Sequence, residues 1–586
     1  MGEKEKIDSL DHGSYNYKMF NFFNRKFKIT EVEPPEDVKE AFSDYVGGGS
    51  EMSADQLRRF LVEKQGDVDC TVSDAERIIE RIVPRQPDAT TDAPHALKID
   101  DFFHFLFHDD LNGPITEKVH QDMTAPLSHY FIYTGHNSYL TGNQLSSDCS
   151  EVPIIKALQR GVRVIELDLW PSSNKDEIVV LHGRTLTSPV SLLKCLKSIQ
   201  EYGFVSSPYP VIITLEDHLT PDLQAKVAEM VTQTFGDMLY YPESDCLTEF
   251  PSPESLKNRI IISTKPPKEY LDEEEASGME IPNNSAEPDS DYRSDSDQED
   301  EDFDVCDRKS GQIGSPEYKR LITIHAGKPK GALKNSLQVA PNKVRRLSLS
   351  EQEFEKAAAS HGTHVVRFTL KNILRVYPKG TRINSSNYNP IIGWMHGAQM
   401  VAFNMQGYGK YLLLMHGMFR ANGGCGYVRK PNFLLQKGPV SEVFDPEKTI
   451  PVQRRLKVKI YLGDGWRLDF SHTHFDTYSP PDFYVKIFIV GVPADNDKRK
   501  TKIIEDDWSP VWNEEFTFLL TIPELALLRI EVREYDKHEK DDFGGQTCLP
   551  VAELKPGIRS VPLYDKKGEK LKDVRLLMRF QFEYVI

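Results

Sequence analysis

Short β-branched runs that alternate with amphipathic stretches, starting near residue 122, constrain the fold more than any other feature. Five such runs lie in the first half of the chain, at 130–134, 162–169, 178–181, 211–215 and 259–262. Alternation of this kind is typical of parallel βαβ units. Three more runs follow an interruption, at 374–377, 400–403 and 426–428. Five strands and three would close one eight-stranded (β/α)8 TIM-like barrel, a distorted one, from two blocks of sequence.

The interruption is an acidic tract between residues 272 and 304, where fifteen acidic residues stand against one arginine. The tract carries most of the formal net charge of −17, so the rest of the chain is close to neutral. Such a segment cannot bury enough apolar area to order itself. We therefore expect barrel halves at 120–265 and 326–440, separated by an acidic disordered linker at 266–325.

Two further units flank the expected barrel. Helical periodicity near 36–46, 53–64, 73–82 and 100–107 predicts an EF-hand-like helical region at 1–110. Its loops lack the alternating oxygens and the glycine of a calcium-binding EF loop, which favours a packing module that binds no calcium. From 450 to 586, short strands and turns without a helical period predict an antiparallel β-sandwich.

Composition limits where the chain works. Seven cysteines are scattered without paired spacing and no apolar leader opens the sequence, so we expect a cytoplasmic location. No apolar run approaches the roughly 18 residues needed to cross a bilayer, so membrane contact would be peripheral. The near-neutral remainder gives no reason to expect a nucleic-acid partner. We expect a monomer, and its protein regulators stay open.

Polar and ionisable residues stand at the ends of four successive predicted strands. Carboxyl ends of parallel strands meet at one mouth, where barrel enzymes place their chemistry. The six residues are His136, Asn137, Glu166, Asp168, His182 and Glu216. Four of them offer only oxygen, which suits a hard cation such as calcium, and this leaves the two histidines for proton transfer. The alternative for any one residue is a capping or structural role.

The segments that carry these residues resemble a known family. Thr134-Gly135-His136-Asn137-Ser138, Glu166-Leu167-Asp168 and His182-Gly183 resemble the X half of the eukaryotic phosphoinositide-specific phospholipases C. The segments 385–388 and 422–431 resemble its Y half. With an EF-like region, a C2 domain and no pleckstrin-homology domain, the order of domains is similar to that of the plant members.

This resemblance implies a reaction. Calcium held by Asn137, Glu166, Asp168 and Glu216 would activate the inositol 2-hydroxyl. Glu166 would act as general base, and His136 and His182 would assist at the phosphate. The expected reaction converts phosphatidylinositol 4,5-bisphosphate to diacylglycerol and inositol 1,4,5-trisphosphate through a 1,2-cyclic phosphate. It would serve lipid signalling at the inner face of the plasma membrane.

The resemblance also implies contacts to the phosphates of the inositol ring. The candidate residues are Lys265, Lys268, Ser348, Arg375 and Tyr377. The chain departs from the animal pattern at Pro267, where a second lysine is expected, so Lys268 is the candidate substitute. Ser348 follows Arg345-Arg346-Leu347, which is also typical of a kinase site, and substrate binding, packing and phosphorylation stay open as its roles.

The acidic residues of the C-terminal unit have the spacing of C2-domain calcium ligands. Asp476 and Asp482 lie in one expected loop, and Glu534, Asp536 and Asp542 in another. Bound calcium would anchor these loops to anionic membrane lipids. The alternative is a solvated acidic rim.

Two alternatives to the whole interpretation remain. A glycerophosphodiester or bacterial-type phosphatidylinositol phosphodiesterase also places histidines on a barrel, but the Y half and the C2-like unit argue against it. A catalytically inactive lipid adaptor is the other, and the presence of both histidines and all four expected metal ligands argues against that.

Overall fold

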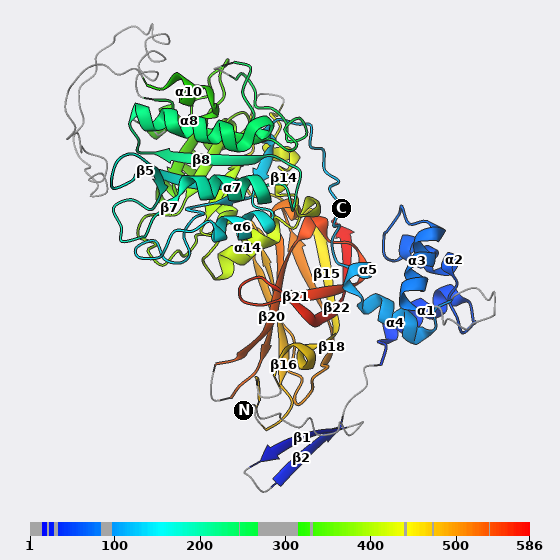
Figure 1. Ribbon diagram of the computed structural model, residues 1–586. Coiled ribbons are helices and arrows are strands. Elements are labelled where there is room, and N and C mark those ends of the chain that lie inside the picture. The colour runs from blue at the N-terminus through cyan, green and yellow to red at the C-terminus, as the bar shows by residue number, and fades with distance from the viewer. Residues whose placement is uncertain are drawn as a thin grey trace.

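The fold is taken from a computed structural model, shown in Figure 1. It describes residues 33–83, 96–244, 247–267, 314–327, 332–438, 442–471, 474–476, 478–537 and 540–585, together with the backbone of the hairpin β1 (Ser14–Met19) and β2 (Phe23–Lys28). Lys268 and the acidic tract at 272–304 lie outside the described residues.

A closed barrel of eight parallel strands forms the largest domain. The strands are β4 (Thr134–Gly135), β5 (Val164–Pro171), β8 (Val211–Asp217), β9 (Ile260–Thr264), β10 (Ile322–Gly327), β11 (Arg346–Ser350), β12 (Ile373–Tyr377) and β13 (Met400–Phe403). Each pairs with the next, and β13 pairs with β4, which closes the circle. The predicted barrel built from two blocks of sequence is confirmed.

The predicted division of strands between the two blocks is wrong. The run at 178–181 becomes β6 (Ile178–Val180), which pairs antiparallel with β5 and continues to β7 (Val190–Ser191). The run at 426–428 becomes β14 (Tyr427–Arg429), which pairs antiparallel with β3 (Tyr130–Ile132) outside the barrel. The missing strands are β10 and β11, so each block supplies four.

Helices surround the barrel and bury their apolar faces against it (Figure 1). They are α6 (Val152–Gln159), α7 (Leu192–Tyr202), α8 (Pro221–Phe235), α10 (Pro316–Arg320), α11 (Leu333–Ser336), α12 (Glu351–Thr369), α13 (Pro390–Met395) and α14 (Lys410–Met418). Helix α10 and the start of β10 lie inside the interval 266–325, so regular structure resumes before the end of the predicted linker. No helix in the described ranges is long and apolar enough to cross a bilayer.

The C-terminal domain is antiparallel, as predicted. Its strands are β15 (Arg454–Asp464), β16 (Phe483–Val490), β17 (Asp497–Lys500), β18 (Val511–Leu520), β19 (Leu527–Glu534), β20 (Asp542–Pro550), β21 (Gly557–Tyr564) and β22 (Lys570–Tyr584), with the short helix α15 (Trp466–Asp469) after β15. A single residue pair, Gln546 with Tyr564, joins β20 to β21, so the strands form two four-stranded halves. Trp466 and Trp512 are buried in the core between them.

The N-terminal helices pack against this C-terminal domain. They are α1 (Glu36–Val46), α2 (Ala54–Glu63), α3 (Val72–Ile82), α4 (Ile99–Phe107) and α5 (Asp109–Asn112). Tyr461 and Leu577 of the C-terminal domain belong to the helices' apolar core. The Asp37 carboxylate accepts hydrogen bonds from Lys459, Tyr461 and Arg579 at 2.7 to 3.0 Å.

The barrel joins the C-terminal domain through helix α14. A side chain at Gly417 would collide with Cys548 of β20, so only glycine allows this close approach. Beside it, Arg420 donates to the Thr547 hydroxyl at 2.8 Å and lies over the Tyr564 ring. The C-terminal domain therefore packs against both the N-terminal helices and the barrel.

Candidate functional site

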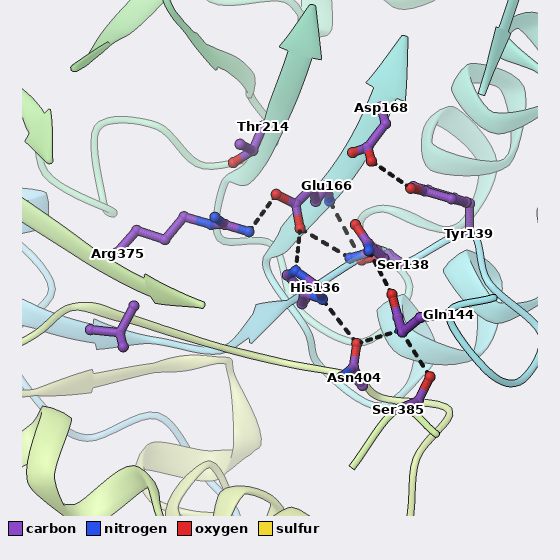
Figure 2. A network of polar contacts seen from close by, with 12 residues as sticks. His136, Ser138, Tyr139, Gln144, Glu166, Asp168, Thr214, Arg375, Ser385 and Asn404 are labelled. Carbon is purple, nitrogen blue, oxygen red and sulfur yellow. Dashed lines mark hydrogen bonds and ion pairs between the residues drawn. The ribbon is translucent and has the colours of Figure 1, made fainter. Parts of the chain in front are cut away.

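The strand-end residues predicted from the sequence gather at one end of the barrel. His136 and Asn137 directly follow β4, and Glu166 and Asp168 point inward from β5. Glu216 lies on β8 in register with Asp168. His182 follows β6, so it enters from the antiparallel hairpin and not from the end of a barrel strand as predicted. Figure 2 shows several of these side chains converging.

His136 is contacted at both of its ring nitrogens. Nδ1 lies 2.9 Å from Asn404 Oδ1, and Nε2 lies 4.0 Å from Glu166 Oε2. The ring is parallel to that of Tyr377, at 6.5 Å between centroids. Burial lowers the pKa of His136, and the nearby Glu166 carboxylate opposes that shift in part. The imidazole therefore lies edge-on to the carboxylate, with Nε2 facing the site.

Asn137 adopts a left-handed backbone conformation with φ of 43°. Asparagine tolerates this region better than most residues, which explains its place directly after the strand. Its backbone N–H donates to Glu166 Oε2 at 3.0 Å, and its side-chain Nδ2 donates to Gln144 Oε1 at 2.8 Å. Because the side-chain amide nitrogen of Asn137 already donates to Gln144, the side-chain carbonyl oxygen is the atom that remains available to a cation.

Glu166 forms an ion pair with Arg375, and each side chain is 2% exposed. Burial by itself raises the pKa of Glu166, but Arg375 and His136 outweigh it and hold the pKa below its ordinary value. The carboxylate is therefore ionised. Arg375, predicted as a phosphate contact, lies inside the barrel with its guanidinium 5.5 Å from the centre of the Tyr377 ring.

Asp168 is a buried carboxylate with one satisfied oxygen. Tyr139 donates to Oδ2 at 2.7 Å, whereas Oδ1 is buried and, among the residues that the structure describes, has no hydrogen-bond partner. Burial raises the pKa of Asp168 well above its ordinary value, and the charges of Glu216 and Glu166 raise it further. A cation would relieve both the orphaned oxygen and the repulsion.

The donor atoms fit a hard cation, although they are not gathered around one. Within the described ranges, no three His, Cys, Asp or Glu side chains are arranged so that they could hold a metal ion. The donors are nevertheless all oxygen, and Asp168 Oδ1 lacks a partner among the described residues. Glu166 is engaged by Arg375, so closing four ligands around a cation requires this carboxylate to turn.

His182 is held by the main chain and by a flat aromatic support. Its Nδ1 donates to the Gln144 carbonyl oxygen at 2.7 Å. A side chain at the adjacent Gly183 would collide with the Trp170 indole, so the loop lies directly on that ring. Trp170 in turn stacks on His218, with ring centroids 4.0 Å apart. The loop therefore presents His182 in one fixed orientation.

The predicted substrate contacts lie on neighbouring strands. Ser348 on β11 is in register with Arg375 on β12, Tyr377 ends β12, and exposed Lys265 directly follows β9. Lys268 lies outside the described residues. Sequence reasoning missed Arg346, which alternation places on the same face of β11 as Ser348.

Arg346 is buried inside the barrel. Its Nη1 donates to the Thr214 hydroxyl at 3.1 Å, and burial lowers its pKa to about 9. A kinase that needs the arginine of this motif would find it inaccessible, which counts against phosphorylation of Ser348. Gln144 and Asn404 were also missed. Asn404 directly follows the last barrel strand and could have been found by the strand-end rule, whereas Gln144 lies in a loop without any pattern.

The acidic residues of the C-terminal domain gather at one end of its strands. Asp482 directly precedes β16, and Glu534 at the end of β19 is in register with Asp542 at the start of β20. Burial raises the pKa of Glu534 to about 8, and the charges of Asp476, Asp542, Asp482 and Asp536 add to the shift. The five carboxyl groups therefore share one region and repel one another.

Fold and site together define a class of protein. A closed parallel barrel carries histidines and carboxylates at one mouth, and it packs against an antiparallel domain with an acidic loop cluster. This combination is typical of a barrel enzyme attached to an antiparallel β domain, because barrel enzymes place their chemistry at this mouth.

Comparison with family profiles identifies the family. Residues 123–266 match the phosphatidylinositol-specific phospholipase C X domain, and residues 320–433 match the Y domain. Residues 454–565 match the C2 domain, and residues 31–113 match the EF-hand-like domain of phosphoinositide-specific phospholipase C. The chain belongs to the phosphoinositide-specific phospholipases C, and it is a phosphoric diester hydrolase.

Individual relatives match over nearly all of this chain. The chain is 65% identical to phosphoinositide phospholipase C 6 of Arabidopsis thaliana, with 100% of each chain covered. It is 56% identical to phosphoinositide phospholipase C 4 of the same plant, over 97% of this chain and 98% of the relative. It is 33% identical to 1-phosphatidylinositol 4,5-bisphosphate phosphodiesterase delta-3 of Mus musculus, over 96% of this chain and 69% of the relative.

The fold also matches solved structures. The crystal structure of S. officinalis PLC21 superimposes with a TM-score of 0.72 at 24% identity, covering 95% of this chain and 69% of that one. At this identity the likeness supports the arrangement of the domains and nothing finer.

Proposed function

We propose that this phospholipase C is calcium-dependent and hydrolyses phosphatidylinositol 4,5-bisphosphate, with less phosphorylated phosphoinositides as further candidates. The products would be diacylglycerol and inositol 1,4,5-trisphosphate, formed through a 1,2-cyclic phosphate. The proposal rests on one observation: His136, the ionised Glu166 and Asp168 lie together at the barrel mouth. Asp168 Oδ1 has no hydrogen-bond partner among the described residues.

The chain's own groups suit this chemistry. Glu166, kept ionised in the barrel interior, accepts the proton of the inositol 2-hydroxyl, and the 2-oxygen attacks the neighbouring phosphorus. His136 and His182 present their Nε2 atoms to the phosphate, and a histidine that is protonated at Nε2 gives this proton to the departing diacylglycerol oxygen. Water then opens the cyclic phosphate by the reverse proton movements.

The metal's part is electrostatic. Asn137, Glu166, Asp168 and Glu216 would hold calcium, whose positive charge would lower the pKa of the 2-hydroxyl and neutralise the phosphate. On the substrate's far side, Lys265, Ser348, Arg375 and Tyr377, with Lys268, would contact the ring and its phosphates.

Membrane contact is proposed to be peripheral, at the inner face of the plasma membrane. Leu145, Leu186 and Ile383 are 47%, 82% and 55% exposed. Backbone hydrogen bonds join them beside the site, from Leu186 N–H to the Leu145 carbonyl and from Gln144 N–H to the Ile383 carbonyl. This apolar rim and calcium bound at the C2 acidic loops would together seat the barrel mouth on anionic lipid.

Vesicle hydrolysis tests the proposal. Phosphatidylcholine vesicles that contain phosphatidylinositol 4,5-bisphosphate should be hydrolysed with calcium and not with chelator. His136→Ala should lose about 10²–10⁴ in turnover, the range for a group that acts in proton transfer. Full turnover in chelator would sink the calcium mechanism, and absence of turnover in every condition would favour the inactive adaptor.

A second variant separates membrane binding from chemistry. Asp482→Asn with Asp536→Asn should weaken calcium-dependent vesicle binding while leaving hydrolysis of a water-soluble short-chain phosphoinositide intact. Unchanged vesicle binding would indicate that the acidic loops are only a solvated rim.

A further inference from the structure

Asn137 and His182 hydrogen-bond directly to one uncharged residue that the mechanism does not use, and His136 is linked to it through Asn404. Gln144 is 8% exposed and lies in the loop that follows the first barrel strand, β4. Its side chain accepts from Asn137 Nδ2 at 2.8 Å and donates to Asn404 Oδ1 at 3.0 Å. Its main-chain carbonyl oxygen accepts a hydrogen bond from His182 Nδ1 at 2.7 Å. Figure 2 shows the side-chain part of this network.

The orientation of each amide in the network is determined by its neighbours. Asn404 Nδ2 donates to the Ser386 carbonyl oxygen at 3.4 Å, so Asn404 Oδ1 faces Gln144 and His136. Gln144 Nε2 donates to Asn404 Oδ1 and, at 2.8 Å, to the Ser385 hydroxyl. Gln144 Oε1 must then face Asn137, as it does. One consistent set of donors and acceptors satisfies the whole chain.

This orientation sets the protonation pattern of both histidines. Asn404 Oδ1 and the Gln144 carbonyl oxygen can only accept, so Nδ1 of His136 and Nδ1 of His182 must each carry a hydrogen. In the neutral rings both Nε2 atoms are then bare and available. Gln144 thus acts on His182 directly, through its main chain, and on His136 indirectly, through the bond from its side chain to Asn404.

The network also crosses between the two halves of the barrel. Gln144, His136, Asn137 and His182 come from the first block of sequence, and Ser385 and Asn404 come from the second. Asn404 is clamped there by Asn387, which accepts from the Asn404 N–H at 2.9 Å and donates to its carbonyl at 3.1 Å. The second block therefore supplies the acceptor that fixes His136.

We propose that Gln144, acting with Asn404, is a positioning residue that fixes the Nδ1–H tautomer of His136 and His182. It also turns the side-chain carbonyl oxygen of Asn137 toward the site. The inference rests on the proposed roles of the two histidines. It adds a residue that touches neither substrate nor metal but determines which histidine nitrogen is available for proton exchange.

Gln144→Glu is the informative variant because it is isosteric and replaces the donor by an acceptor that carries a negative charge. The introduced carboxylate repels Asn404 Oδ1, so the Asn404 amide turns and His136 loses the acceptor at Nδ1. Long-range ¹H–¹⁵N correlation spectra of ¹⁵N-histidine-labelled full-length chain should show His136 moving to the Nε2–H tautomer. His182 should keep its Nδ1–H tautomer, since the main-chain carbonyl is unchanged.

Kinetics give the second readout. Turnover of Gln144→Glu should fall roughly 10–100-fold, as for outer partners that orient a site's groups. KM should change less than about twofold, because the lost interaction acts in the transition state. Asn404→Asp keeps an acceptor against His136 Nδ1, so it should retain the Nδ1–H tautomer.

Gln406→Glu is the matched control. Gln406 donates to the same Ser385 hydroxyl and to the Gly142 carbonyl, both at 3.3 Å, and neither of these bonds involves His136. The change should leave tautomers and kcat unchanged. An unchanged His136 tautomer in Gln144→Glu overturns the inference, whatever happens to turnover. Full turnover by His136→Ala would instead overturn the proposed function, while the tautomer spectra would still decide the role of Gln144.

Discussion

Replacing Arg375 by methionine tests how strongly the barrel interior depends on its buried ion pair. The side chains of Arg375 and Glu166 are each 2% exposed. Methionine keeps most of the arginine stem and removes the charge. Glu166 would retain the hydrogen bond from the Asn137 N–H at 3.0 Å but would lose the guanidinium that balances its charge.

The expected loss of stability is large. Removing one partner of a buried ion pair costs about 3–5 kcal/mol, because the other charge is left uncompensated. With a urea dependence of about 3 kcal/mol per M, the unfolding midpoint of the barrel should fall by about 1–1.7 M. The matched control is Lys257→Met, which breaks an ion pair with Glu254 whose side chains are 39% and 43% exposed. That change should cost about 0–1 kcal/mol.

The loss should also depend on pH. Burial raises the pKa of Glu166, but Arg375 and His136 bring it below the ordinary value of 4.5. A carboxyl with a lower pKa in the folded chain stabilises the fold above the unfolded pKa, and this stabilisation is lost as pH falls. The difference between the parent and Arg375→Met should therefore be largest at neutral pH and shrink below about pH 4.5.

Hydrogen exchange in urea, followed by mass spectrometry, measures the loss of stability of the barrel domain alone. Peptides from β5 and β12 report the barrel, and peptides from the C2 domain serve as the internal reference. Glu166→Gln combined with Arg375→Met should recover much of the loss, since both charges are then gone. A loss below about 1 kcal/mol, or one that is the same at every pH, would refute the buried ion pair.

Three further predictions concern the joints between domains. Burial lowers the pKa of His416 well below its ordinary value, and the charges of Arg160 and Arg420 add to the shift, so the unfolded chain protonates at this histidine first as pH falls below about 6.5. His416→Gln should therefore make the melting temperature less sensitive to acid between about pH 6.5 and 5. An unchanged slope of melting temperature against pH would contradict this prediction. Gly417→Ala should push α14 away from β20 at a cost of about 1–3 kcal/mol and speed thiol labelling of buried Cys548; an unchanged labelling rate would contradict the close contact. Asp37→Asn removes the charge that pairs with Lys459 and Arg579. It should make the N-terminal helices more susceptible to limited proteolysis. Unchanged cleavage would show that the apolar contact alone holds these helices against the C-terminal domain.

The barrel could be predicted because most of its strands are continuous apolar runs, buried on both faces. Two strands escaped detection because polar residues interrupt their apolar runs. In β11 Arg346 and Ser348 alternate with leucines, and β10 carries Thr323 and His325. Two apolar strands that pair antiparallel outside the barrel, β6 and β14, were predicted as barrel strands in their place. Periodicity detects burial, but it does not distinguish barrel strands from antiparallel strands that are buried against them.

The site shows the same division. His136, Glu166 and Asp168 were predictable because a strand end fixes where a side chain points. Gln144 was not, because its partners Ser385 and Asn404 lie 241 and 260 positions away in the sequence, and no local pattern carries that information. The burial of Arg375 escaped for the same reason, since the carboxylate it contacts lies on a strand of the other half.

The position of Arg375 leads to a prediction about calcium itself. Its guanidinium occupies the same carboxylate, Glu166, that the proposed calcium site requires, so the two cations compete. Arg375→Met should therefore bind calcium more tightly at the barrel, by roughly tenfold if the coupling has the usual size of about 1–3 kcal/mol. Isothermal titration calorimetry measures this, in a background with Asp482→Asn and Asp536→Asn to silence the C2 loops. Equal or weaker affinity would show that Glu166 can serve both cations at once, or that it is not a calcium ligand.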